Sequence, residues 1–364
     1  MQVAYRVRAR AADIEARARS IAVEQSIEMP PHALRDPRVR AEVLGRVDDI
    51  VDQADGHFLV TIALALETTG FEAGQLMNML FGNSSLHPDI ELVDVGLPAD
   101  ATAAFGGPRF GIEGLRRLTG AHDRPMTCTA LKPQGSSIRA LAQLARQFAL
   151  AGIDMIKDDH GLADQLSAPF AERARAVQEA VSEANAISGH RTIYAPSLTG
   201  GPRRLMAQLE AAKNAGVGAL LIAPMISGMG ALQECATAGL PVLGHPALAG
   251  ATRIHPALLL GKLFRLAGAD AVIYPNHGGR FSFTPQLCLS VAESARAPWH
   301  DMATAMPVPA GGIQLDRVDE LVTFYGTDVM LLIGGALLEA PDVEATAREF
   351  VERVAARATQ GMHP

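Results

Sequence analysis

The densest group of residues able to do chemistry is MIKDDH, at 155–160, where an apolar run ends. If this run is a strand, its side chains alternate, so Lys157 and Asp159 point to the same side. Such a pair is either a buried ion pair or part of a metal site. Lysine is a cation and a poor ligand, but carbamylation by CO2 would make Lys157 an anionic oxygen donor. With Asp159 and His160 it would then hold one Mg²⁺ ion, although a histidine ligand also suits Mn²⁺ or another transition ion.

Three further residues are candidates for moving protons. Lys132 ends the apolar run in TALKPQG. Near a divalent cation its pKa would fall, which makes it a candidate general base or acid, the alternative being a surface lysine at a turn. His245, in LGHPALAG, is either a proton shuttle or a loop histidine held by its neighbours. His277 is the second candidate for returning a proton.

Glycine pairs and one arginine are candidates for binding a phosphate group. The segments PAGGI and IGGAL place Gly311, Gly312, Gly334 and Gly335 at the ends of two apolar runs. Paired glycines let backbone N–H groups approach an anion, although two tight turns would have the same composition. Arg280, in NHGGRF, suits bidentate phosphate recognition unless it is an ordinary exposed loop residue.

These residues are positioned by a repeating pattern that begins near residue 126. Short apolar runs end in polar or glycine-rich turns, and amphipathic helical stretches follow. Eight such units predict an α/β fold with a (β/α)8 barrel over residues 126–364, whose strand ends form the active site. An open doubly wound sheet is the alternative, but no GxGxxG or GxxxxGK[ST] loop follows any strand. The predicted strands are Met126–Pro133, Ile153–His160, Arg191–Leu198, Gly218–Ile226, Pro241–Leu248, Asp270–His277, Met306–Gly312 and Asp328–Gly335.

Residues 1–125 have a different pattern and predict a small α+β domain of ferredoxin-like type. VAYRVRA and GHFLVTIALAL are typical of strands, and DIEARARSIAVEQ is typical of a helix. The segment FGGPRFGIEGLRRLTGAHDRP is rich in glycine and arginine, and it is expected to link this domain to the barrel.

Composition excludes several classes of protein. The 364 residues carry a formal net charge of −7 and are 48 % apolar, so neither a nucleic-acid-binding protein nor a disordered chain is expected. Three scattered cysteines predict neither disulfides nor a zinc knuckle. The charged N-terminus and the lack of a long apolar run predict no signal peptide and no membrane span, hence a cytoplasmic enzyme.

Taken together, these motifs resemble the RuBisCO superfamily. TALKPQG is similar to its T-x-x-K-P-K-x-G motif, and IKDDH to its K-D-D-E motif, which contains the carbamylated lysine. GHPAL resembles the strand-five H-R-A segment, and PAGGI and IGGAL resemble the phosphate loops. SIAVEQSIE resembles the segment whose glutamate, here Glu24, completes the active site of a neighbouring subunit, and LFGNSSL resembles a further N-terminal motif. The resemblance therefore implies a homodimer with shared active sites.

Departures from the family pattern decide what the resemblance implies about activity. His160 replaces the metal-binding glutamate, Pro246 replaces a phosphate-anchoring arginine, and Ala310 replaces the serine before the first glycine pair. The loop-six lysine that assists CO2 addition is absent from YPNHGGRF. The resemblance is therefore to the RuBisCO-like branch, which enolises a phosphorylated substrate without fixing CO2.

Three reactions of this branch fit, and the residues do not separate them. Isomerisation of 5-methylthioribulose 1-phosphate ranks first. Decarboxylation of a phosphorylated 3-oxo-sugar acid, of the 3-oxo-isoapionate 4-phosphate type, ranks second, and enolisation of a diketo-methylthiopentyl phosphate ranks third. An apolar pocket would favour the first, and an additional cation beyond Arg280 would favour the second. Retention of Lys132, Lys157 and Asp159 argues against a binding protein without catalysis.

Overall fold

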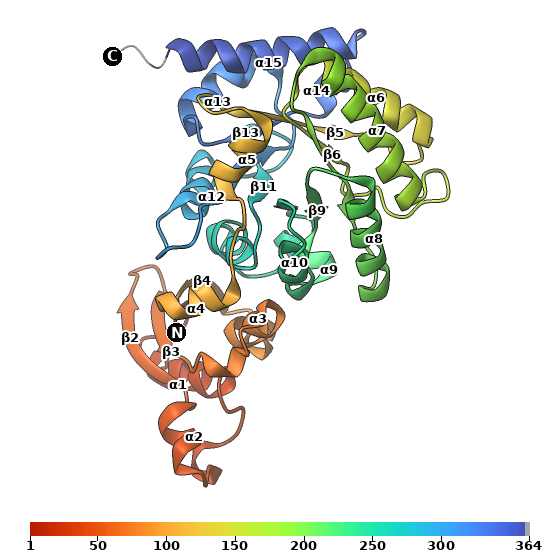
Figure 1. The fold of residues 1–364 in the computed structure, drawn as a ribbon. Helices are drawn as coiled ribbons and strands as arrows, with labels where there is room; N and C mark the ends of the chain where they lie inside the picture. Colours follow the sequence, from red (N-terminus) through yellow and green to blue (C-terminus); the bar gives the residue numbers. More distant parts are fainter. Residues whose placement is uncertain (361–364) are drawn as a thin grey trace.

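A computed structural model describes residues 1–360 of the chain. Figure 1 shows a small sheet with its helices in the lower part of the view and a ring of strands wrapped by helices in the upper part. The first strand of that ring begins at Met126. The overall architecture is the predicted α+β region followed by a (β/α)8 barrel.

The N-terminal sheet is antiparallel, with the strand order β2-β3-β1-β4. With helices α1 (Ile14–Glu24) and α3 (Ala73–Phe81), the chain order is βαββαβ, the ferredoxin-like arrangement. β1 and β3 are the two strands predicted from their alternation. β2 was missed because its sequence, RVDDIVD, is mostly charged, as is common for an edge strand. The strands are β1 (Gln2–Arg8), β2 (Arg46–Asp52), β3 (His57–Ala63) and β4 (Ile90–Gly96).

The barrel contains parallel strands at all eight predicted positions. One ladder runs β13-β5-β6-β7 and the other β8-β9-β10-β11-β12, and β12 packs beside β13. β7 and β8 form one barrel strand, interrupted at Pro196 because proline has no N–H to donate. The strands are β5 (Met126–Leu131), β6 (Met155–Asp158), β7 (Ile193–Ala195), β8 (Ser197–Leu198), β9 (Leu220–Ile222), β10 (Val242–Gly244), β11 (Ala271–Pro275), β12 (Met306–Ala310) and β13 (Met330–Leu332).

Each observed strand lies inside its predicted range but is shorter. The residues that were predicted to extend each strand at its C-terminal end belong instead to the loops of the barrel mouth. The fourth predicted strand was too long: Pro224 and Met225 begin a short helix, α9 (Pro224–Ser227), because proline favours the first turn of a helix.

Helices surround the strands, as the amphipathic stretches predicted. α7 and α8 both end at a glycine in the left-handed conformation, which satisfies the last carbonyls. One segment before α11 is a π-helix, η5 (Ala257–Leu263). The covering helices are α6 (Ile138–Leu150), α7 (Phe170–Ser188), α8 (Pro202–Ala215), α10 (Met229–Ala236), α11 (Phe264–Leu266), α12 (Pro285–Arg296), α13 (Val318–Tyr325) and α15 (Val343–Gln360).

The segment expected to be a linker is instead part of the barrel core. It forms helix α5 (Gly111–Thr119), whose Ile112 and Leu115 join the apolar cluster inside the barrel. The glycines and arginines suggested an exposed connection, but the apolar positions lie on one face of a helix. Other members of the cluster come from the strands, among them Met126, Cys128, Met155, Leu221, Leu243, Ile273, Met306, Val308 and Met330.

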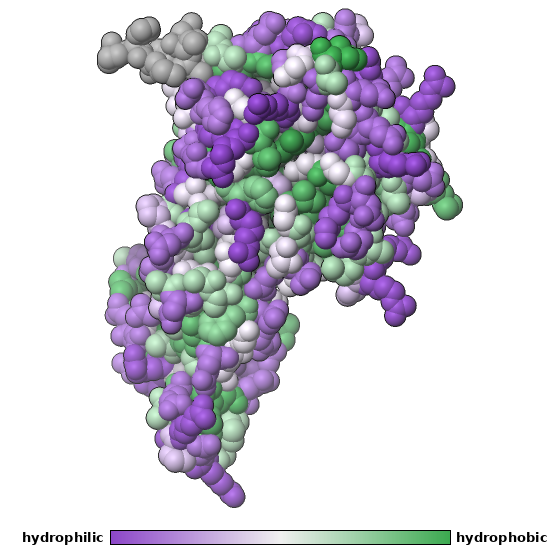
Figure 2. Space-filling model, in the orientation of Figure 1, coloured by the Kyte–Doolittle hydropathy of each residue, from purple (hydrophilic) through white to green (hydrophobic). Residues whose placement is uncertain are grey.

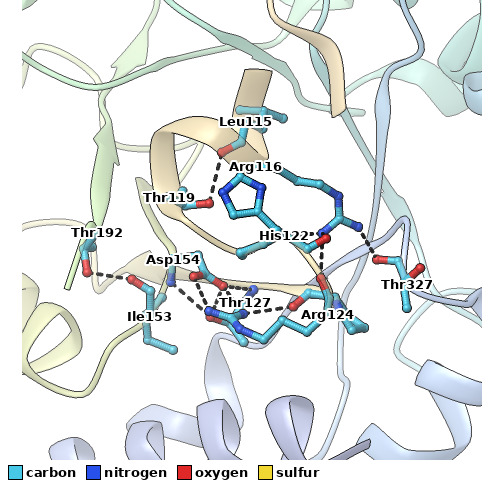
Figure 3. A network of polar contacts seen from close by, with 12 residues as sticks. Leu115, Arg116, Thr119, His122, Arg124, Thr127, Ile153, Asp154, Thr192 and Thr327 are labelled. Atoms are coloured by element: carbon cyan, nitrogen blue, oxygen red, sulfur yellow. Dashed lines mark hydrogen bonds and ion pairs between the residues drawn. The ribbon is translucent and has the colours of Figure 1, made fainter. Parts of the chain in front are cut away.

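A polar network fixes the N-terminal ends of the strands beneath α5 (Figure 3). Arg124 donates to both carboxylate oxygens of Asp154 at 2.7 Å, and Asp154 also accepts from the backbone and hydroxyl of Thr127. Arg116 donates to the carbonyls of His122 and Thr327, among others. These bonds tie β5, β6 and β13 together at the end of the barrel opposite the mouth.

Figure 2 shows hydrophilic residues spread over the visible face, with apolar ones between them. This distribution agrees with the ordinary composition of the chain. Within residues 1–360, no helix combines the length and the apolar character that crossing a bilayer requires.

Candidate active site

A cavity of about 1310 Å³ opens at the carboxyl ends of the barrel strands. The N-terminal sheet contributes to its wall through Arg6, Arg8 and Glu91. The sequence did not identify these three residues, because their role depends on how the sheet packs against the barrel. Ten of the twelve predicted site residues line the cavity: Lys132, Lys157, Asp159, His160, His245, Arg280, Gly311, Gly312, Gly334 and Gly335.

The end of β6 places Lys157 and Asp159 on the cavity side, as alternation predicted. Lys157 is only 3 % exposed, and its Nζ donates to the carbonyl of Asp158 at 3.0 Å. Burial lowers the pKa of Lys157, and the nearby Lys132 lowers it further, against the opposing effect of Asp159. A lysine with a lowered pKa has more of its neutral amine, and the neutral amine is the form that reacts with CO2.

Asp158, between these two residues, points away from the cavity and anchors the strand. Its carboxylate is fully buried and accepts from Arg173 Nε at 3.2 Å, Tyr194 Oη at 2.8 Å and the backbone of Ser197 at 3.1 Å. Arg173 is also fully buried, and it donates to the carbonyl of Ala168 as well. The network ties β6 to α7 and to the third barrel strand. The alternation of side chains that placed Lys157 on the cavity side also places Asp158 on the opposite side of the strand.

Lys132, at the end of β5, shares the carboxylate of Asp159. Its Nζ lies 3.1 Å from Asp159 Oδ2, while the N–H of Gly161 donates to Oδ1 at 2.9 Å. Burial alone would raise the pKa of Asp159, but the Gly161 N–H and the Lys132 ammonium bring it below its usual value. Asp159 is therefore held as a carboxylate, which is the form that binds a metal.

His160 and His245 stack against each other, with ring centroids 4.2 Å apart and an angle of 13° between the rings. The N–H of Ala247 donates to Nδ1 of His245 at 3.1 Å, so the neutral ring carries its proton on Nε2. Burial, and after it the Lys157 charge, lowers the pKa of His245 to about 2. The neutral ring of His245 can then donate a hydrogen bond only from Nε2, and the side chain lines the cavity.

The loops after β11 and β12 interlock through their glycines. The N–H of Arg280 donates to the carbonyl of Gly311 at 2.8 Å, and a Cβ at Gly279 would lie 2.2 Å from that oxygen. Gly311 and Gly312 have φ values of 94° and 101°, which side chains rarely adopt. Gly334 and Gly335 lie where a short helix, α14 (Gly335–Leu338), begins after β13.

Two predicted site residues do not line this cavity. His277 is buried beside Phe324, its carbonyl accepts from Arg317 at 2.9 Å, and its Nε2 has no partner among the described residues. Glu24 lies in the N-terminal domain, where its Oε1 accepts from Asn83 Nδ2 at 2.9 Å. The same amide nitrogen also donates to Glu28.

The donor set fits a single divalent cation. Among the described residues, no three His, Cys, Asp or Glu side chains gather as a ready metal site. Asp159 and His160 would supply two donors, and Lys157, buried beside them with a lowered pKa, would supply the third when carbamylated. The cluster lies at the mouth of a parallel (β/α)8 barrel with glycine pairs at its seventh and eighth strands, where barrel enzymes place their catalytic residues and frequently bind phosphate.

Comparison with known proteins identifies the family. Residues 111–281 match the model of the ribulose bisphosphate carboxylase large chain, catalytic domain. The chain is 50 % identical to "Ribulose bisphosphate carboxylase-like protein 1" of Rhodopseudomonas palustris over 97 % of both chains. It is also 50 % identical to "5-methylthioribulose-1-phosphate isomerase" of Rhodospirillum rubrum, over 99 % of this chain and 98 % of the other. A Rubisco-like protein structure from R. palustris superimposes with a TM-score of 0.90, at 50 % identity and over 97 % of both chains. The chain belongs to the RuBisCO family, within its RuBisCO-like branch.

Proposed function

We propose that the protein is a RuBisCO-like isomerase that converts 5-methylthioribulose 1-phosphate through an enediolate, without CO2 fixation. The observation that carries the proposal is the cluster of Lys132, Lys157 and Asp159 beside a neutral His245. The isomerase name of the R. rubrum relative, which matches over nearly the whole of both chains, supports this choice among the reactions of the branch.

Carbamylated Lys157, Asp159 and His160 would hold Mg²⁺. When bound, the cation would polarise the substrate carbonyl and stabilise negative charge on its oxygen. Lys157 reacts with CO2 because burial favours its neutral amine. His160 lines the cavity next to Asp159, with its Nδ1 3.3 Å from Asp159 Oδ1, so its ring would lie beside the bound cation.

Lys132 acts as the base. Its amine removes the proton from the carbon next to the carbonyl and returns it to the former carbonyl carbon, while the hydroxyl proton moves between the two oxygens. The carbonyl is thereby shifted by one carbon. His245 donates from Nε2 to a substrate oxygen and does not itself exchange a carbon-bound proton, since its other nitrogen accepts from Ala247.

The phosphate would lie on the N–H groups of the two glycine pairs, with Arg280 beside them. Gly312 supports this role, since a Cβ there would lie 3.1 Å from the backbone nitrogen of Arg280, so the loops after β11 and β12 form one wall. His277 is not included in the mechanism, because it packs against Phe324 and does not line the cavity. We further propose a homodimer in which Glu24 completes the site of a second copy.

Proton exchange in D2O tests the proposal. The enzyme, with Mg²⁺ and bicarbonate, is expected to incorporate deuterium into 5-methylthioribulose 1-phosphate and to release an isomeric ketose phosphate, both visible by NMR. Removing Lys132 should lower the exchange rate by about 10²–10⁴-fold, as for other general bases. Exchange without an isomeric product would favour the enolase reaction, and release of CO2 from a 3-oxo-sugar acid phosphate would favour the decarboxylase.

The role of Lys157 is tested separately by ¹³C NMR with labelled bicarbonate. Wild-type protein and Lys132→Ala should both give a carbamate signal, whereas Lys157→Ala should give neither the signal nor activity. Full activity of Lys157→Ala would contradict the carbamate.

A further inference from the structure

Leu248, in the loop after β10, has a backbone conformation that disfavours its own side chain. Its φ is 68° and its ψ is 0°. The N–H of Ala249 donates to the carbonyl of Pro246 at 2.9 Å, so Leu248 is the third residue of a β-turn. These angles belong to a type II turn, where glycine is usual at that position because a branched side chain is strained there.

Nothing in the described protein packs over this leucine to compensate for the strain. Leu248 is 60 % exposed and lines the cavity. Its carbonyl accepts from Ala251 at 3.1 Å, a bond that any residue would make. A strained conformation that the fold itself does not require suggests a functional reason for the side chain.

The turn also ties this leucine to the reacting groups. Ala247, immediately before Leu248, donates the N–H that fixes the ring of His245. Pro246 and Ile254 line the cavity near by, and Ile254 pairs with Leu92 of the N-terminal sheet. The backbone of Leu248 therefore directly follows the residue that orients the His245 ring.

The loops that line the cavity differ in the side chains they present. The glycine pairs and Arg280 lie on the loops after β11, β12 and β13, whereas the loop after β10 presents apolar side chains. The one cation of that loop, Arg253, is engaged by the carbonyls of Ile90 and His87. The N-terminal sheet, which meets this loop at the Leu92–Ile254 pair, adds Arg6, Arg8 and Glu91 to the wall, and Arg6 is paired with Asp55 at 2.7 Å. The apolar side chains of the loop itself therefore suit an uncharged, apolar part of the substrate.

We propose that Leu248 binds the alkylthio end of the substrate and determines the preference for a methylthio group over a hydroxyl group. The proposal rests on the proposed isomerase function and adds the residue that selects this substrate. The side chain contacts the thioether while the opposite end of the cavity holds the phosphate. The contact with the thioether explains why leucine occupies a position whose backbone conformation favours glycine.

The test compares 5-methylthioribulose 1-phosphate with the analogue that carries a hydroxyl group in place of the methylthio group. Leu248→Asn keeps a similar size and tolerates the left-handed conformation, but it is polar. Its ratio of kcat/KM for the two compounds should fall about tenfold in favour of the hydroxyl analogue, as for loss of a small apolar contact. Leu248→Met should keep the wild-type ratio. Leu166→Asn, a fully exposed leucine outside the cavity, is the matched control and should also keep it.

Thermal unfolding and molecular mass are measured alongside. If Leu248→Asn fails to fold, Leu248→Gly, which relieves the strain, replaces it with the same expectation. An unchanged ratio, an equal loss with both compounds, or dissociation into smaller species would overturn the proposal. If wild-type protein turns over neither compound, the proposed function fails, and calorimetric binding of the two phosphates then decides the role of Leu248 alone.

Discussion

One carboxylate, Asp159, lies between two lysines of different character. Lys157 is buried and its pKa is lowered, whereas Lys132 lies closer to the cavity and pairs with Asp159 at 3.1 Å. A divalent cation at Asp159 would compete with the Lys132 ammonium for the same oxygen. Metal binding would therefore release Lys132 Nζ from its ion pair with Asp159 and leave it free to contact the substrate.

His277 provides a prediction of pH-dependent stability. Burial, and then the neighbouring Arg317, lowers its pKa from the ordinary value near 6.5, against the effect of Glu320. The unfolded chain then binds a proton at a pH where the folded chain does not. The stability that His277 contributes is present above about pH 6.5 and decreases as the pH falls towards its folded pKa, at up to about 1.4 kcal/mol per pH unit.

Urea unfolding at about pH 7.5 and about pH 5.5 measures this effect. In His277→Leu the loss of unfolding free energy between the two values should be smaller than in the wild type. His32→Gln, an exposed histidine, serves as the control and should behave like the wild type. An identical pH dependence in His277→Leu would contradict the prediction.

At the scale of elements, the strand carrying Lys157 and Asp159 is fixed by Asp158. Replacing Asp158 with alanine would leave the charge of the fully buried Arg173 without its carboxylate partner. We expect Asp158→Ala to lose about 3–5 kcal/mol of unfolding free energy. Tyr194→Phe, which removes one of the three bonds to the carboxylate, should lose about 1 kcal/mol. Equal, small losses in urea unfolding for the two variants would argue against a buried ion pair as the anchor.

The elements show how far the sequence determines the fold. Strong apolar runs bounded by turns located all eight barrel strands, and alternation within MIKDDH oriented Lys157, Asp158 and Asp159. β2 was missed because an edge strand needs little apolar character, and α5 was read as a linker because its buried face is short. In both cases the deciding factor was packing against a distant part of the chain.

The sequence predicted which residues line the cavity where those residues lie at strand ends. It did not predict the positions of residues in the loops beyond the strands. His277 follows β11, yet the glycines after it turn the chain so that the imidazole packs against Phe324 outside the cavity. Leu248 gave no sequence signal, because its importance depends on a backbone angle. The limit of the domains at residue 125 remains a prediction, as do the catalytic roles assigned to the site residues.

At the scale of the whole molecule, the proposed role of Glu24 in an active site requires a second chain. It pairs with Asn83 in the N-terminal domain and does not line the cavity of its own barrel. If a second copy receives it, each active site contains residues from both chains. Glu24→Ala and Lys132→Ala should then each be nearly inactive alone, although each retains one half of every site.

Mixing these two variants after dissociation and reassembly gives a decisive result. Half of the dimers formed at random are mixed, and each mixed dimer has one intact site, so activity should recover to about a quarter of the wild-type value. Two variants of the same half, Lys132→Ala and Lys157→Ala, should recover none and serve as the control. No recovery in the first mixture, with mixed dimers confirmed by mass spectrometry, would place Glu24 outside the shared site, and its bond to Asn83 would then be purely structural.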